Sequence, residues 1–134
     1  MKVERIHAGT LECAIIVRHE YQEEGIVFFT DDHYSQQLAY MNRPRGYEID
    51  PHVHNPVIRT VKNTNEVLFI RKGKVHVDFY DKEKNFVDHR ILVQGDVILL
   101  IDGGHGFRFL ENSEIIEVKQ GPYAGEKDKT RFKR

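Results

Sequence analysis

The sequence predicts an all-β fold, and three observations support this prediction. Apolar residues occur in short runs rich in Val, Ile, Phe and Tyr, the residue types that favour pleated strands. Turn-forming residues separate the runs, for example at 43–46, 62–65 and 71–74. No stretch shows a helical apolar period over three turns, and only 32–37 is expected to hold a single helical turn. About eleven short strands at close spacing indicate a β-sandwich or barrel.

The expected strands follow one another along the whole chain. They cover residues 11–19, 26–30, 37–42, 46–54, 57–62, 67–71, 74–80, 86–93, 97–101, 107–110 and 115–119. Residues 74–80 alternate between polar and apolar, so we expect one face of that strand to contact solvent. Residues 97–101 are apolar throughout, which predicts a strand covered on both faces. The polar tail 121–134 is expected to be an extended, partly disordered surface segment.

Length and composition narrow the possible classes of protein. The 134 residues fit one domain over 1–134. A net charge of -1, from 20 basic and 21 acidic residues, gives no electrostatic basis for binding nucleic acid or an anionic membrane. The single cysteine excludes an intramolecular disulfide, and the charged N-terminus lacks the apolar run of a signal peptide. We therefore expect a cytoplasmic protein whose partner is a small molecule.

Three histidines and one glutamate are predicted to point into the same apolar interior. His52 and His54 lie two residues apart in an expected strand, so their imidazoles share one side. Glu66 shares the parity of the apolar side chains that follow it, and His105 shares that of two later phenylalanines. An unpartnered buried polar group costs about 1–3 kcal/mol. A divalent Fe, Mn, Ni, Cu or Zn ion would satisfy all four groups, because imidazole and carboxylate are suitable ligands.

Each of these residues also has a simpler interpretation when taken alone. A single His-x-His is weak evidence for a metal, Glu66 can be a strand-end charge that reaches water, and His105 can be a turn residue. The four together, each at a strand end with matching parity, favour the metal site. The remaining five histidines are expected to be solvated: His7, His19, His33, His76 and His89.

The spacing of these residues resembles the first cupin motif. Five residues separate Gly46 from His52-x-His54, and six residues separate Glu66 from a second glycine, Gly73. The segment between His54 and Glu66 has eleven residues, where cupins usually have three or four. We interpret this insertion as a longer hairpin that forms one wall of a pocket.

The second cupin motif is matched in kind. Gly95 is followed by an apolar run, a Gly-Gly turn and then His105, without the usual Pro and Asn. The resemblance spans about 37–120 and implies a double-stranded β-helix, a jelly-roll barrel, with 121–134 as its tail. It also implies His52, His54, Glu66 and His105 as metal ligands, and a homodimer. The apolar Val67 and Phe69, on the opposite face of their strand, also require a cover such as a dimer partner or a second sheet.

The resemblance implies an enzyme that acts on a small oxygen-rich metabolite, such as a sugar, a sugar derivative or a keto acid. The expected reaction is a metal-dependent isomerisation, epimerisation or dioxygenation, with Glu48, Tyr40 and Arg59 as candidate catalytic groups around the metal. Two alternatives stay open. One is a cupin that binds a carbohydrate or another small molecule without turnover. The other is a metal-free sugar-nucleotide epimerase with a His base and a Tyr acid.

Overall fold

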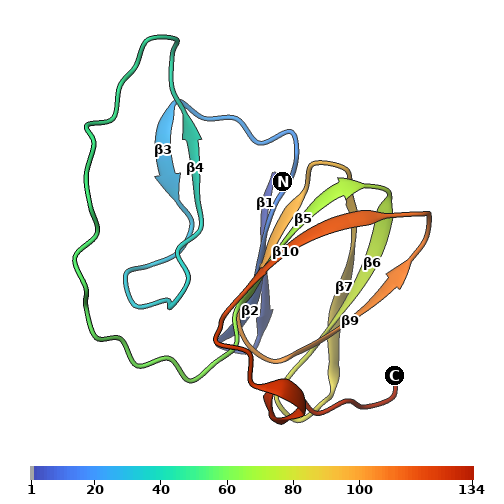
Figure 1. Cartoon of the computed structure of the whole chain (residues 1–134). Helices are drawn as coiled ribbons and strands as arrows, with labels where there is room; N and C mark the ends of the chain where they lie inside the picture. Colours follow the sequence, from blue (N-terminus) through green and yellow to red (C-terminus); the bar gives the residue numbers. More distant parts are fainter. Residues whose placement is uncertain (1) are drawn as a thin grey trace. The chain divides into compact units, whose positions relative to one another are not determined.

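The computed structural model describes residues 2–134, and this part of the chain is all-β, as predicted (Figure 1). Its strands are β1 Val3–Ala8, β2 Leu11–Val17, β3 Gly25–Phe28, β4 Ala39–Asn42, β5 Glu66–Lys72, β6 Lys74–Tyr80, β7 Phe86–Val93, β8 Val97–Leu100, β9 Gly104–Phe109 and β10 Glu114–Lys119. One short 3-10 helix, η1, spans Gly125–Asp128. The chain forms two compact units, residues 2–21 with 63–134 and residues 22–62, and each is described by itself.

The first unit consists of two antiparallel sheets. The larger has the strand order β1-β2-β8-β5-β10, and the smaller has the order β7-β6-β9. β8 lies in the middle of the larger sheet, and its residues 98–100 are buried, as the unbroken apolar run predicts. Apolar side chains from both sheets pack into one core, which contains Ile6, Cys13, Ala14, Ile16, Leu68, Ile70, Val75, Val77, Phe79, Leu92, Ile98 and Leu100.

Nine of the eleven expected strands form, and two predictions were wrong. Residues 46–54 and 57–62 form no strand, and the side chain of Ile58 there is 99% exposed. Pro51 and Pro56 interrupt this stretch, and proline cannot donate a hydrogen bond to a neighbouring strand. The predicted helical turn at 32–37 is also absent; turns and bends occupy that segment. Conversely, β1 forms although its charged residues hid the strand pattern.

The expectation of a solvated face on β6 was also wrong. Asp78 and His76 lie on that face, yet their side chains are only 8% and 15% exposed. The end of the polar tail packs over this face, where Arg134 bonds to Asp78. His76 is therefore a partly buried residue and not the solvated one that the alternating pattern predicts. Within the tail, the η1 turn is followed by a stretch without regular secondary structure that leads to this contact.

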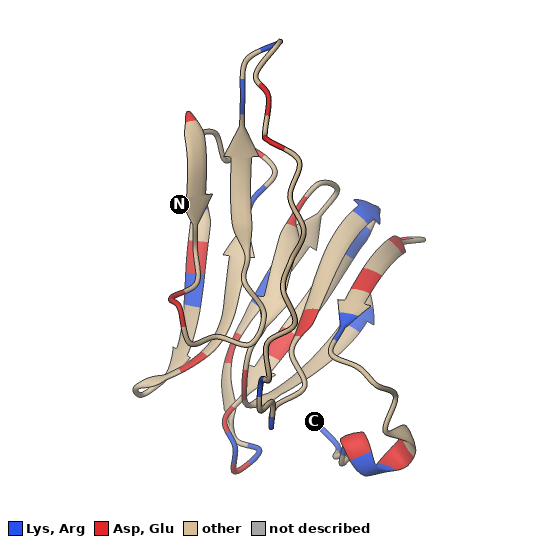
Figure 2. Cartoon of the chain, turned by 60° about the vertical axis from the view of Figure 1, so that its left-hand side comes forward, with Lys and Arg blue, Asp and Glu red and all other residues tan. Residues whose placement is uncertain are grey.

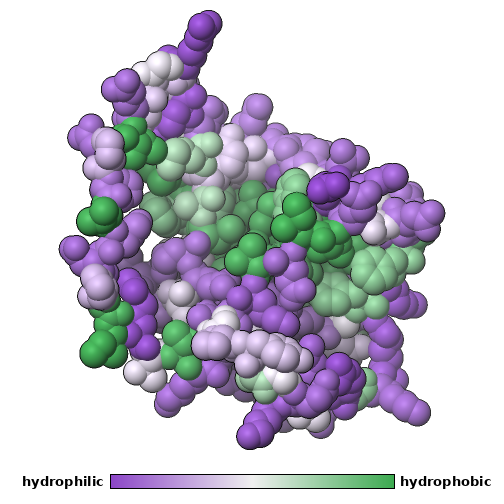
Figure 3. Space-filling view, viewed as in Figure 1, coloured by the Kyte–Doolittle hydropathy of each residue, from purple (hydrophilic) through white to green (hydrophobic). Residues whose placement is uncertain are grey.

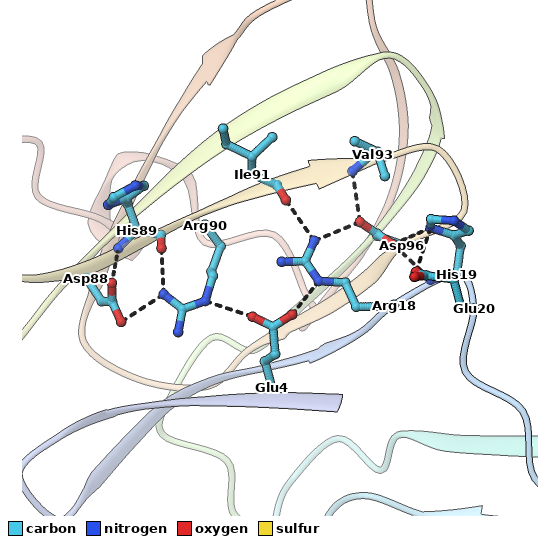
Figure 4. Close-up of polar contacts among 10 residues, drawn as sticks. All are labelled: Glu4, Arg18, His19, Glu20, Asp88, His89, Arg90, Ile91, Val93 and Asp96. Carbon is cyan, nitrogen blue, oxygen red and sulfur yellow. Dashed lines mark hydrogen bonds and ion pairs between the residues drawn. The ribbon is translucent and has the colours of Figure 1, made fainter. Parts of the chain in front are cut away.

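Asp96 is a fully buried carboxylate in the turn between β7 and β8 (Figure 4). It accepts hydrogen bonds from the backbone amides of Val93 and His19, both at 2.8 Å, and from the Arg18 guanidinium at 3.0 Å. Burial alone would raise the pKa of Asp96, but these donors outweigh it and hold the pKa below its usual value. Arg18 also pairs with Glu4 on β1 and donates to the carbonyl oxygen of Ile91 on β7, so the network joins both sheets at one edge.

The second unit is a hairpin followed by a long segment without strands. β3 and β4 pair in an antiparallel register, and a hydrogen bond of 2.9 Å between Thr30 and Gln37 closes the loop between them. The Arg43 guanidinium then lies 4.4 Å from the centre of the Tyr47 ring. Gly46, between these two, has a φ of +87°, a conformation that favours glycine.

Charges of both signs are interspersed over the strands, as the net charge of -1 leads one to expect (Figure 2). Opposite charges meet in several exposed pairs, such as Arg71 with Glu114 at 3.0 Å. Within residues 2–134, no helix has the length and apolar character that crossing a membrane requires.

The buried position of Asp96 predicts a large stability loss for Asp96→Asn, measured by urea denaturation at pH 7. We expect a loss of about 3 kcal/mol, because Arg18 keeps its charge but loses its buried partner. The stabilisation is present above the pKa of the unfolded aspartate and is lost as pH falls through the lower folded pKa. The difference between the two proteins should therefore narrow below about pH 4.

The matched control is Asp88→Asn, which removes a more exposed carboxylate of β7 that pairs with Arg90. Its loss should stay under about 1 kcal/mol. Equal effects of the two substitutions would contradict the role given to Asp96.

Candidate functional site

Glu66 and His105 meet between the two sheets of the first unit. Glu66 opens β5 in the larger sheet, and His105 is the second residue of β9 in the smaller one. The Glu66 Oε2 atom lies 3.3 Å from the His105 Nε2 atom, and the Glu66 side chain is 14% exposed. Leu68 and Ile70, which share the parity of Glu66, are buried in the core. The predicted inward direction of Glu66 is thus confirmed, and the structure brings it together with His105.

The local backbone explains how His105 reaches this position. Gly103 precedes β9 with a φ of +77°, and a Cβ atom there would collide with the carbonyl oxygen of Tyr80. Only glycine fits this turn, which delivers His105 directly into the pairing with β6. Its ring lies beside that of Phe107, with 5.4 Å between the ring centres. On the other sheet, Glu66 is held in register opposite Leu100 of β8.

The Glu66 carboxyl group is ionised at neutral pH. The hydrogen bond from His105 is the main cause that lowers its pKa, and burial acts in the opposite direction. Electrostatic interactions with His105, Lys119 and Lys129 lower the pKa of Glu66 further. The result is a half-buried anion next to an imidazole nitrogen, an arrangement that attracts a cation.

His52 and His54 form a second pair, which lies in the second unit. Their ring centres are 5.3 Å apart at an angle of 74°. The Nδ1 atom of His52 is 2.9 Å from the carbonyl oxygen of Asp50. Because a carbonyl only accepts, Nδ1 is the donor in this contact, and in the neutral imidazole Nε2 of His52 then carries the lone pair. This kind of hydrogen bond orients many metal-binding histidines.

The three candidate catalytic residues also belong to the second unit. Tyr40 lies on β4 in register with Val27 and is half-buried. Glu48 and Arg59 are exposed and lie in the segment without strands. Their roles, and the convergence of all four predicted ligands on one ion, stay predictions.

The donors of the Glu66–His105 pair suit a divalent transition metal. A carboxylate oxygen and an imidazole nitrogen each lie about 2.0–2.2 Å from such an ion. Two ligands in neighbouring positions around the ion are then about 3–3.5 Å apart, and the pair observed here is separated by 3.3 Å. The chemistry and the spacing of these atoms therefore fit a shared ion.

A third cluster of potential metal ligands was not predicted from the sequence. His19, Glu20 and Asp96 place potential ligand atoms within 4.8 Å of one another. However, both oxygens of Asp96 already accept hydrogen bonds from the chain, which indicates a structural role. Because His19 and Asp96 are 77 residues apart, no local pattern links them.

Comparisons with known proteins identified no relative of this chain. No protein-family model matches the chain, and neither does any curated protein or solved structure. The cupin resemblance thus rests on the two motifs in the sequence, and the candidate site rests on its own geometry.

The Glu66–His105 contact predicts that His105→Ala raises the pKa of the Glu66 carboxyl group. The substitution removes the hydrogen bond that lowers this pKa, while the burial that raises it is largely retained. A pH titration of the carboxyl carbon by 13C NMR would measure the change. His89→Ala, at an exposed histidine of β7, is the control and should leave the Glu66 titration unchanged. An identical pKa of Glu66 in wild type and His105→Ala would contradict the contact.

Proposed function

We propose that this protein is a metal-binding cupin in which His52, His54, Glu66 and His105 hold one divalent transition metal. The observation that carries the proposal is the pair of Glu66 and His105, whose ligand atoms are 3.3 Å apart. The pair brings a carboxylate oxygen and an imidazole nitrogen, both suitable metal ligands, to one point, and this supports a metal-binding role. The free Nε2 atom inferred for His52 suits the same role.

The proposed fold is a cupin jelly roll, a finer statement than the all-β class. Two antiparallel sheets with one shared core support it. We also propose a homodimer. The outer face of β5 and β10 exposes Phe69, Ile116 and Val118, and Figure 3 shows apolar surface over these strands. Contiguous apolar surface of this kind favours contact with a partner.

The proposed activity is the conversion of a small oxygen-rich metabolite: a sugar, a sugar derivative or a keto acid. When bound, the metal supplies a Lewis acid, or a site for dioxygen chemistry if it is iron. Glu66 contributes the negative charge of the ligand set. Arg59 is proposed to bind a carboxylate or phosphate of the substrate, and Glu48 and Tyr40 to move protons. Turnover of such compounds, followed by NMR, separates this enzyme from a protein that only binds them.

The ligand assignment predicts that His52→Ala/His54→Ala loses the bound metal. Both proteins are purified without chelator, and the metal is measured by elemental analysis. We expect about one equivalent per chain in wild type and at least about a tenfold loss in the variant, because each lost imidazole removes a metal–nitrogen bond.

The control for this experiment is His33→Ala/His89→Ala, which removes two exposed histidines that are not predicted ligands. It should retain the wild-type metal content. Equal, near-zero metal in wild type and in the His52→Ala/His54→Ala variant would refute the assignment.

A further inference from the structure

Two glycines of β9 leave an opening on the outer face of the smaller sheet. Gly104 and Gly106 flank His105, so they face outward where His105 points into the sandwich. A Cβ atom at Gly104 would lie 3.1 Å from Cζ of Phe132, and one at Gly106 would lie 3.0 Å from Nη2 of Arg134. The missing side chains therefore make room for two residues of the C-terminal segment.

Arg134 makes the polar contacts of this segment. Its Nε atom donates to Oδ2 of Asp78 at 2.9 Å, and its Nη2 atom donates to the carbonyl oxygen of Phe107 at 3.2 Å. The Asp78 side chain is almost fully buried, and its other oxygen lies 2.8 Å from Nε2 of His76. Without Arg134, the buried carboxylate would lose its closest permanent positive charge.

Phe132 makes the apolar contact. Its ring meets the ring of Tyr80 edge to face, with 5.0 Å between the centres, and Tyr80 is itself buried. The ammonium group of Lys84, in the turn between β6 and β7, lies 5.9 Å from the centre of the Phe132 ring. Aromatic pairs of this geometry contribute beyond the area that they bury.

The spacing of the two contacts explains their fit. Phe132 and Arg134 are two residues apart, as are the glycines against which they pack, and Lys133 between them is exposed. In an extended chain, residues at this spacing point to the same side. A segment with the pattern aromatic-x-arginine therefore fits this face. Its aromatic ring packs against the Tyr80 ring, and its guanidinium group pairs with the Asp78 carboxylate.

We propose that Gly104, Gly106, Asp78 and Tyr80 form a recognition slot for an aromatic-x-arginine segment, and that its occupant is residues 132–134 of the same molecule. The slot lies behind the strand that carries His105, so its occupant supports that strand from the side opposite to the candidate site. The proposal goes beyond the proposed function and needs no metal.

The test measures backbone order of residues 132–134 by 15N relaxation of the full chain. In wild type, we expect the heteronuclear NOE values of these residues to equal those of β6 and β9. Asp78→Asn should lower them to the values of a flexible chain end, with order parameters below about 0.6. Asp88→Asn, at an exposed carboxylate of the same sheet, should leave them unchanged.

A second variant covers the case in which Asp78→Asn does not fold. Phe132→Ala/Arg134→Gln changes only the occupant, and Lys133→Gln is its matched control. The double variant should release the segment, and the control should not. A segment that is flexible in wild type, or that stays ordered in the double variant, would overturn the proposal.

An isotope-filtered NOE experiment on mixed 13C-labelled and unlabelled wild-type chains identifies the occupant. We expect the contact between the rings of Phe132 and Tyr80 only within a molecule. A contact between labelled and unlabelled chains would show that a second copy fills the slot, and would overturn the assignment to the same molecule.

Discussion

The buried carboxylate of Asp96 is the interaction on which the two-sheet architecture depends. It accepts hydrogen bonds from the backbone amide of His19, just after β2, and from that of Val93, the last residue of β7. Arg18 carries the connection onward to Glu4, which also pairs with Arg90 of β7. The network thereby connects an edge strand of the larger sheet, β1, to an edge strand of the smaller sheet, β7. Because β8 follows directly, this network also fixes the strand that lies between β2 and β5.

The candidate site depends on that arrangement. Leu100 at the end of β8 lies in register with Glu66, so the position of β8 sets where the carboxylate enters the space between the sheets. His105 arrives from the opposite sheet through a turn that only glycine allows. The two residues are 39 positions apart in sequence, and only the stacking of the two sheets brings them to 3.3 Å.

Much of this could be predicted from the sequence, because a strand alternates its side chains strictly. The parity of Glu66 with Leu68 and Ile70 gave its inward direction, and the apolar run at 97–101 indicated a covered strand. Local sequence patterns gave wrong predictions where distant residues determine whether a strand forms or a side chain is buried. Residues 46–62 have strand-like composition but pair with no strand among residues 2–134. β1 is stabilised by charge pairs to residues 14 and 86 positions away. The cover over His76 and Asp78 comes from the far end of the chain.

The most direct test of the central claim is to count the imidazole ligands of a bound ion. The full chain is loaded with Co²⁺ as the probe, and its X-ray absorption fine structure is recorded for wild type and for His105→Ala. We predict three imidazoles together with oxygen ligands in wild type, and two imidazoles in the variant. A spectrum with fewer than two imidazoles in wild type, or one that His105→Ala leaves unchanged, would contradict the proposed site.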